Sequence, residues 1–130
     1  MKISVNYPSE VASGNSIDFE VTVTNTNFTF KEIEYNGAYP ADILIFDANG
    51  SEVWRHMTGA IILPGGSTQL PPRGSVTFTV KWDGLSHDEI TLTPGQYSIR
   101  AFTEFRFDET DNRTSHHLST TPTELQITAK

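Results

Sequence analysis

The chain has 130 residues, of which 36% are hydrophobic and 11% aromatic, and this composition excludes a disordered chain. Its formal net charge of -7 and its nine scattered Lys and Arg residues argue against a partner made of nucleic acid, which needs a basic face. It has no cysteine, so disulfides, thiolate nucleophiles and Cys-ligated zinc are excluded.

Short apolar runs, broken by Gly, Pro and Asn, predict strands rather than helices along the chain. The clearest strand is Ser16–Asn25, where apolar residues at every second position predict one buried and one solvated face. In chain order, the expected strands are Lys2–Tyr7, Ser16–Asn25, Asp42–Asp47, Glu52–Met57, Ser75–Trp82, Gln96–Phe107 and Glu124–Thr128.

A β-hairpin is predicted around Asn49-Gly50, between Asp42–Asp47 and Glu52–Met57. Both turn residues tolerate a positive φ, which a tight hairpin turn requires. The first strand of this hairpin is apolar on both faces, so we expect it to lie centrally in its sheet.

The expected strands and the turn signals between them favour an all-β fold, an immunoglobulin-like antiparallel β-sandwich of about seven to nine strands. Residues 1–130 are expected to form a single domain of this type. Its structural core should include Trp54, Trp82 and Tyr97, because each lies in a strand pattern. For the two tryptophans, core packing is favoured over the stacking of a sugar or peptide.

Three long segments lack a clear strand pattern. Asn25–Pro40 is predicted as a strand end plus a partly paired loop, and Thr58–Gly74 and Asp108–Thr123 as loops. In the last segment, Asp108, Glu109 and Asp111 could bind Ca²⁺ through carboxylate oxygens. A solvated acidic loop is the preferred interpretation, so no metal and no other cofactor is expected.

Catalytic signals are missing from the sequence. There is no Gly-x-Ser-x-Gly elbow after a strand, and Gly65-Gly66 lacks the following Lys and helix of a phosphate-binding loop. We therefore expect a non-catalytic, protein-binding domain. Three Asn-x-Ser/Thr sequons begin at Asn27, Asn49 and Asn112, and the sequence leaves their glycosylation open.

Four segments follow one another in the middle of the chain: ILIFDANGSEVWRH, GAIIL, LPPRGSVTFTVKWDG and LTPGQYSIRA. This succession resembles the BsuPI-type intracellular proteinase inhibitor family, and the resemblance covers roughly Ile17–Phe105. Val53-Trp54-Arg55 and Trp82-Asp83 are its most specific parts. One departure is that Ile61-Ile62-Leu63-Pro64 replaces the Phe-Gln type step that usually follows Val-Trp-Arg.

The resemblance implies a β-sandwich that inhibits a subtilisin-like serine protease. If such an inhibitor presents a loop to the protease, the segment Ile61–Arg73 is a candidate because its prolines restrict the unbound chain. The protease-contact candidates in it are Leu63, Leu70 and Arg73. The alternative for this loop is that it only closes one end of the sandwich.

A structural or adhesive module of a cell-surface or secreted assembly is the alternative function. The sequons, the Thr-rich surface and self-association through open sheet edges would fit it. The chain has no run of 18 apolar residues, so membrane insertion is not expected. We expect a cytoplasmic protein if the chain is complete, and an extracellular or cell-surface one if a signal peptide has been removed.

Overall fold

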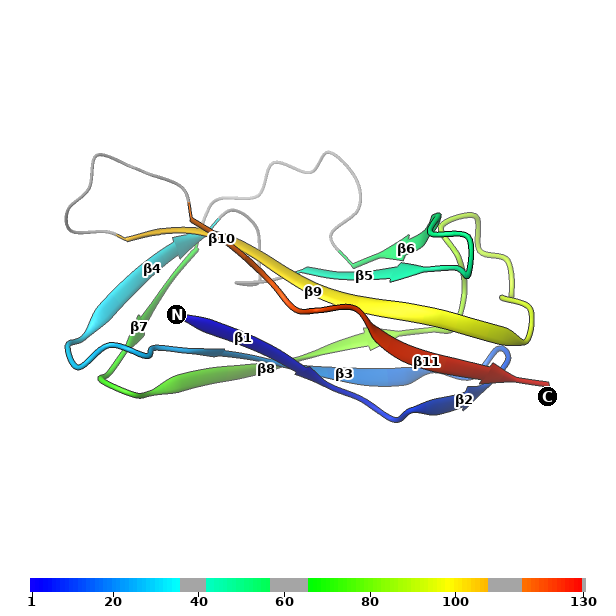
Figure 1. Ribbon diagram of the computed structural model, residues 1–130, viewed down its shortest axis with the longest axis horizontal. Helices are drawn as coiled ribbons and strands as arrows, with labels where there is room; N and C mark the ends of the chain where they lie inside the picture. The colour runs from blue at the N-terminus through cyan, green and yellow to red at the C-terminus, as the bar shows by residue number, and fades with distance from the viewer. Residues whose placement is uncertain (36–41, 57–65, 108–115, 130) are drawn as a thin grey trace.

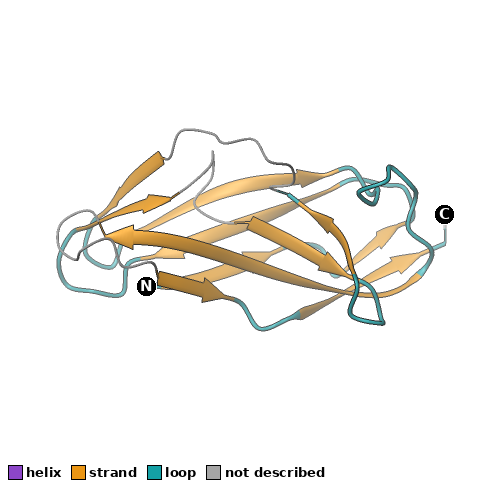
Figure 2. Ribbon diagram, turned by 90° about the horizontal axis from the view of Figure 1, so that it is seen from above, coloured by secondary structure: helices purple, strands orange, loops and turns teal. Residues whose placement is uncertain are grey.

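The computed structural model describes residues 1–35, 42–56, 66–107 and 116–129. These residues form strands, turns and loops, and none of them is helical (Figure 2). No helix among them is long and apolar enough to span a membrane. The strands are β1 (Lys2–Asn6), β2 (Glu10–Ala12), β3 (Ile17–Thr24), β4 (Lys31–Tyr35), β5 (Asp42–Phe46), β6 (Glu52–Arg55), β7 (Gly66–Leu70), β8 (Ser75–Trp82), β9 (Gly95–Phe107), β10 (His116–Ser119) and β11 (Thr123–Thr128).

The strands form two sheets that enclose the core, which confirms the predicted β-sandwich (Figure 1). The smaller sheet has the antiparallel order β1-β3-β8. In β3 the burial alternates strictly, because every second side chain of a strand points to the same face. The apolar residues Phe19, Val21 and Val23 of that face are fully buried.

The larger sheet is organised by β9, whose 13 residues are long enough for two partners along each edge. Along one edge, β5 pairs with its first part and β4 with its last residues. Along the other edge, β11 pairs with residues 95–99 of β9 and β10 with residues 102–105. All these pairs are antiparallel, whereas β2 joins β11 in parallel. The long strand therefore connects the two ends of the molecule (Figure 1).

The core lies between the two sheets. Trp82 is 1% exposed and packs near Phe19, with ring centroids 6.4 Å apart. Tyr97 is buried and its hydroxyl donates a hydrogen bond of 2.8 Å to the carbonyl of Thr93. This bond to the backbone just upstream resembles the tyrosine corner of immunoglobulin-like sandwiches. Trp54 differs from the prediction, since it is only partly buried and packs against the core.

The predicted number of strands, seven to nine, was too low. The structure adds β2, which pairs with β11, and β4, β7 and β10 inside the three segments that the sequence assigned mainly to loops. For β4 and β7, the strand conformation depends on a partner far along the chain. β7 pairs with β4, from Lys31↔Leu70 to Tyr35↔Gly66, and β10 pairs with the second half of β9.

The β5–β6 hairpin forms as predicted, with β5 between β6 and β9. Its turn differs in detail from the expected one. Gly50 has a φ of 83° and donates its N–H to the carbonyl of Asp47, but Asn49 does not have a positive φ. The carboxylate of Asp47 accepts the backbone N–H groups of Asn49 and Ser51. The side chain of Asp47 therefore stabilises a wider turn than the two-residue type.

Candidate functional site

Asn25, the residue after β3, connects two loops at one end of the sandwich. It is fully buried, and its side-chain Nδ2 group donates to the carbonyls of Thr29, Leu70 and Pro71 at 2.8, 3.2 and 3.1 Å. One of these carbonyls belongs to the β3–β4 loop and two lie at the end of β7. Because a buried amide needs partners for both its N–H groups, this geometry ties the two segments together.

Further hydrogen bonds fix the same two segments. The Oδ1 atom of Asn25 accepts the backbone N–H of Asn27 at 2.9 Å. The backbone N–H of Asn25 donates to the carbonyl of Gly74 at 2.8 Å, and that of Arg73 donates to the carbonyl of Asn27 at 3.3 Å. The loops are thus held to each other by backbone and side-chain bonds. We call the two segments Asn25–Phe30 and Pro71–Gly74 together the tip.

The β7–β8 side of the tip is a tight turn. Gly74 donates its N–H to the carbonyl of Pro71 at 2.8 Å, with Pro72 and Arg73 at the two central positions. Arg73 has a φ of 60°. A proline followed by a residue of positive φ is the pattern of a type II turn. A Cβ atom on Gly74 would lie 2.4 Å from Cγ of Pro71, so this position accepts only glycine without a shift of the proline ring.

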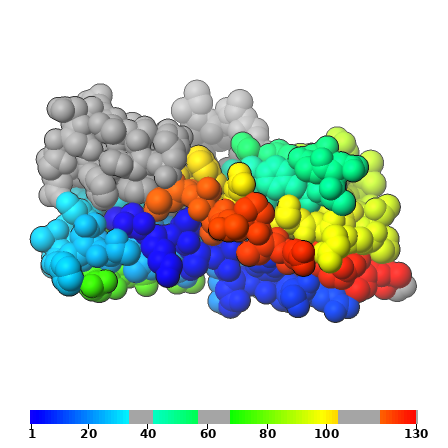
Figure 3. Space-filling view, in the orientation of Figure 1, coloured from blue at the N-terminus to red at the C-terminus, as the bar shows by residue number. Residues whose placement is uncertain are grey.

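The tip exposes large apolar side chains. Phe28 is 79% exposed and Phe30 is 59% exposed. The guanidinium carbon of Arg73 lies 4.6 Å from the centre of the Phe28 ring, within the range of a cation–π contact. In the space-filling view, the two loops form the left end of the molecule, with cyan and green atoms side by side (Figure 3). An exposed aromatic group on a restrained backbone is suited to enter a pocket of another protein.

The predicted contact residues fall in three different situations. Arg73 is exposed and lies in the tip. Leu70 is 1% exposed in β7, so the expectation that it contacts a protease is corrected, because its side chain is packed in the core. Leu63 lies outside the described residues. Phe28 and Asn25 were missed as site residues, since the sequence showed Phe28 only as the middle of a sequon and Asn25 only as a strand end.

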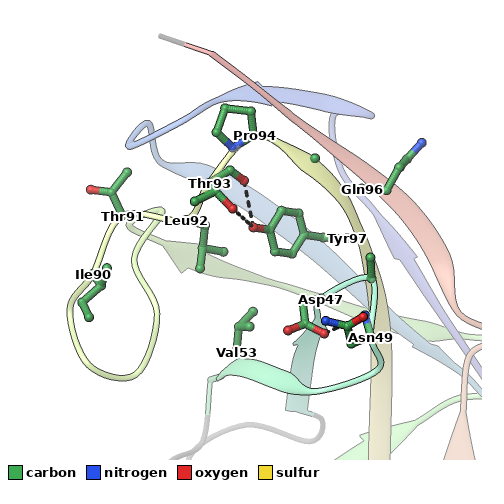
Figure 4. Close-up of a pocket in the computed structure, with 12 residues that line it drawn as sticks. Asp47, Asn49, Val53, Ile90, Thr91, Leu92, Thr93, Pro94, Gln96 and Tyr97 are labelled. Carbon is green, nitrogen blue, oxygen red and sulfur yellow. Dashed lines mark hydrogen bonds between the residues drawn. The ribbon is translucent and has the colours of Figure 1, made fainter.

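The opposite end of the sandwich has a third exposed large apolar residue, Ile90, at 62% exposure. It belongs to the β8–β9 loop, which is closed by hydrogen bonds between Ser86 and Ile90. A hollow of about 440 Å³ lies between this loop and the β5–β6 turn, lined among others by Asp47, Val53 and Tyr97 (Figure 4). The hydroxyl of Tyr97 points towards Thr93 and donates its hydrogen bond to the Thr93 carbonyl. The Tyr97 hydroxyl proton is therefore already used within the fold.

Charged and polar side chains at the β6 strand form a short chain of contacts. Arg55 lies 3.0 Å from Glu52 and 3.7 Å from Asp42, and His87 lies 3.2 Å from Glu52. Burial lowers the pKa of His56, and the nearby carboxylate of Asp42 opposes this shift only in part. The carboxylate of Asp42 is buried, whereas the side chains of Arg55, Glu52 and His87 are partly exposed. These four side chains contain no arrangement of nucleophile and base.

Within the described part of the chain, no group of three or more His, Asp or Glu residues is placed to hold a metal ion. The calcium candidates Asp108, Glu109 and Asp111 lie outside that part, as does the sequon residue Asn112. The other two sequon residues are described. Asn27 belongs to the tip, and Asn49 lies in the exposed β5–β6 turn.

The comparisons with known proteins add a family match. A family model described as BsuPI, intracellular proteinase inhibitor, matches residues 5–106. No curated protein matches the chain. One similar solved structure is a CARDB domain from Pyrococcus furiosus in complex with di-metal ions, at 14% identity and a TM-score of 0.46, covering 97% of this chain and 85% of that one. Another is a β-glucosidase from Listeria innocua with isofagomine, at 15% identity and a TM-score of 0.44; the match covers 97% of this chain but only 16% of the enzyme.

Proposed function

The chain belongs to the BsuPI family of intracellular proteinase inhibitors, and on that premise we propose that it inhibits a subtilisin-like serine protease by inserting the tip into the active-site cleft. The observation that carries this proposal is the exposure of Phe28 on a backbone fixed by the buried Asn25. Inhibition by occlusion needs no catalytic group on the inhibitor.

A restrained backbone supports tight binding because less conformational entropy is lost when the complex forms. In the tip, the two loops are already joined by Asn25 and by the bond from Arg73 to Asn27. Two prolines further limit the β7–β8 side, since each fixes its own φ. The tip therefore meets the first requirement of an inhibitor, which is a preformed contact surface.

A side chain that fills a pocket is the second requirement. Binding energy in protein interfaces is concentrated in a few residues, which are often aromatic or arginine. Subtilisin-type proteases favour large apolar side chains in their main specificity pocket. Phe28 matches this preference better than Arg73, and Phe30 adds a second exposed aromatic side chain to the tip.

The proposal is tested by titrating a subtilisin with the purified wild-type chain, Phe28→Asp and Ile90→Asp. Both substitutions replace an exposed apolar residue by a carboxylate, but at opposite ends of the sandwich. We expect wild type and Ile90→Asp to inhibit equally. Phe28→Asp should inhibit at least about a hundredfold less, because a carboxylate would enter an apolar pocket unpaired.

The thermal stability of the three proteins is the control, and it should be nearly the same because both positions are on the surface. If wild type inhibits and Phe28→Asp is equally potent, the tip is not the contact surface. If the wild-type chain inhibits neither this subtilisin nor the cognate intracellular protease, the inhibitory function itself is refuted.

A further inference from the structure

Arg73 has an unusual backbone conformation for its residue type. Among the described residues, only Arg73 and Glu89 combine a side chain with a positive φ, at 60° and 61°. In this region Cβ crowds the backbone of an ordinary residue, whereas glycine adopts it freely. Residues with strained backbone conformations cluster at ligand-binding and switch sites, so each one is a candidate to be tested.

The turn itself does not require an arginine. The third residue of a type II turn is usually glycine, sometimes asparagine, because the φ is positive there. The hydrogen bond from Arg73 to Asn27 uses only the backbone N–H and would survive in a glycine variant. The fold thus explains the backbone of position 73 and leaves its long cationic side chain unexplained.

The guanidinium group of Arg73 lies over one side of the Phe28 ring, which the proposed function places in the protease. Its guanidinium carbon is 4.6 Å from the Phe28 ring centre, and no ion pair joins it to any described carboxylate. This is notable in a chain with a net charge of -7. One face of the guanidinium contacts the ring, while its N–H groups can still bind a carboxylate in the planar, two-bond geometry.

We propose, resting on the proposed function, that Arg73 determines specificity: it orients Phe28 and binds a carboxylate at the rim of the protease's apolar pocket. The preferred target is then a protease whose pocket is bordered by an acidic side chain. A positive charge at the tip also offsets the repulsion between this acidic chain and such an acidic rim.

The test compares Arg73→Gly with Glu89→Gly, the matched change at the other residue of positive φ. Both variants relieve backbone crowding, so both melting temperatures should stay the same or rise by a few degrees. Inhibition of a subtilisin with an acidic residue beside its pocket should weaken at least about tenfold for Arg73→Gly and not at all for Glu89→Gly. Arg73→Lys, which keeps the charge without the planar fork, should fall between wild type and Arg73→Gly.

The dependence of inhibition on ionic strength is an independent test of the role of Arg73. Inhibition by wild type should weaken as ionic strength rises, and this dependence should shrink in Arg73→Gly. Equal potency and equal salt dependence of wild type and Arg73→Gly would overturn the inference while leaving the inhibitory function intact. A clear loss of melting temperature in Arg73→Gly would also overturn it, because Arg73 would then serve the fold. Lack of inhibition by wild type would refute the proposed function and this inference with it.

Discussion

Trp54 and Trp82 lie against each other across the hydrophobic core, with ring centroids 6.0 Å apart and planes inclined by 43°. They differ in burial, since Trp82 is 1% exposed and Trp54 is only partly buried. Trp82 also donates its indole N–H to the carbonyl of Leu85 at 2.8 Å. The β5–β6 hairpin is therefore joined to the smaller sheet by one partly buried and one enclosed indole.

Because the two indoles differ in burial, replacing each by alanine should lower the free energy of unfolding by a different amount. Trp82→Ala should lower the free energy of unfolding by about 3–5 kcal/mol, because it empties a fully enclosed site. Trp54→Ala should cost only roughly 1–2 kcal/mol, since less apolar area is lost from the interior. Urea unfolding of both variants measures the difference. Equal costs would show that Trp54 is as enclosed in solution as Trp82.

The buried amide of Asn25 leads to a second prediction: two substitutions at this position should lower the free energy of unfolding by different amounts. Asn25→Ala should lower the free energy of unfolding by about 1–3 kcal/mol, because buried carbonyls lose their donor. Asn25→Asp has the same shape but should cost more than about 3 kcal/mol at neutral pH, since a buried carboxylate would face those carbonyls.

Acidification provides the control for this comparison, because a protonated Asp can again donate one hydrogen bond. The deficit of Asn25→Asp relative to wild type should shrink as the pH falls, whereas that of Asn25→Ala should not. If Asn25→Asp is as stable as wild type near pH 7, the hydrogen bonds of Asn25 do not hold the tip.

The strands and the tip differed in how well the sequence predicted them. The strand Ser16–Asn25 is predictable because apolar residues occupy every second position, and this alternation is a local property of the sequence. The structure confirms it with alternating burial in β3. The role of Asn25 depends on carbonyls 45 and 46 residues away. No local pattern could show that an asparagine at the end of a strand would meet them.

The prediction that Leu70 contacts a protease was wrong for a related reason. It lies between Gln69 and Pro71, in a context of Gly, Ser and Pro that is typical of a loop. The structure places it opposite Lys31 in the β4–β7 ladder, and its side chain enters the core. Strand pairing over a long separation thus overrode the local signal.

Two glycines have nearly the same positive φ but different surroundings. Replacing each by alanine therefore distinguishes the cost of backbone strain from the cost of steric crowding. Gly50 has a φ of 83° and no atom within 4 Å of an added Cβ, whereas Gly84 has a φ of 85° and the carbonyl oxygen of Asn15 at 2.6 Å. Gly50→Ala should cost about 1–2 kcal/mol from the conformation alone. Gly84→Ala should cost at least about 1 kcal/mol more, because a backbone must move. Chemical denaturation distinguishes them, and identical losses would contradict the close approach of Gly84 to Asn15.

His56 predicts a pH dependence of stability. Burial holds its pKa below the usual 6.5, so the unfolded chain binds a proton at a higher pH than the folded chain does. The resulting stabilisation is complete above pH 6.5 and is lost as the pH falls from there through the folded pKa. Between about pH 7.5 and pH 5.5, wild type should therefore lose more unfolding free energy than His56→Gln. Parallel pH profiles of the two proteins would contradict the burial of this imidazole.

The central claim, that the tip is the surface that meets the protease, is tested most directly by amide hydrogen exchange. The chain would be measured alone and saturated with a subtilisin whose catalytic serine is replaced by alanine, which leaves the cleft open. We expect new protection in the Asn25–Phe30 and Arg73–Gly74 segments, and none around Ile90 at the opposite end. Protection around Ile90 with an unchanged tip would contradict the account.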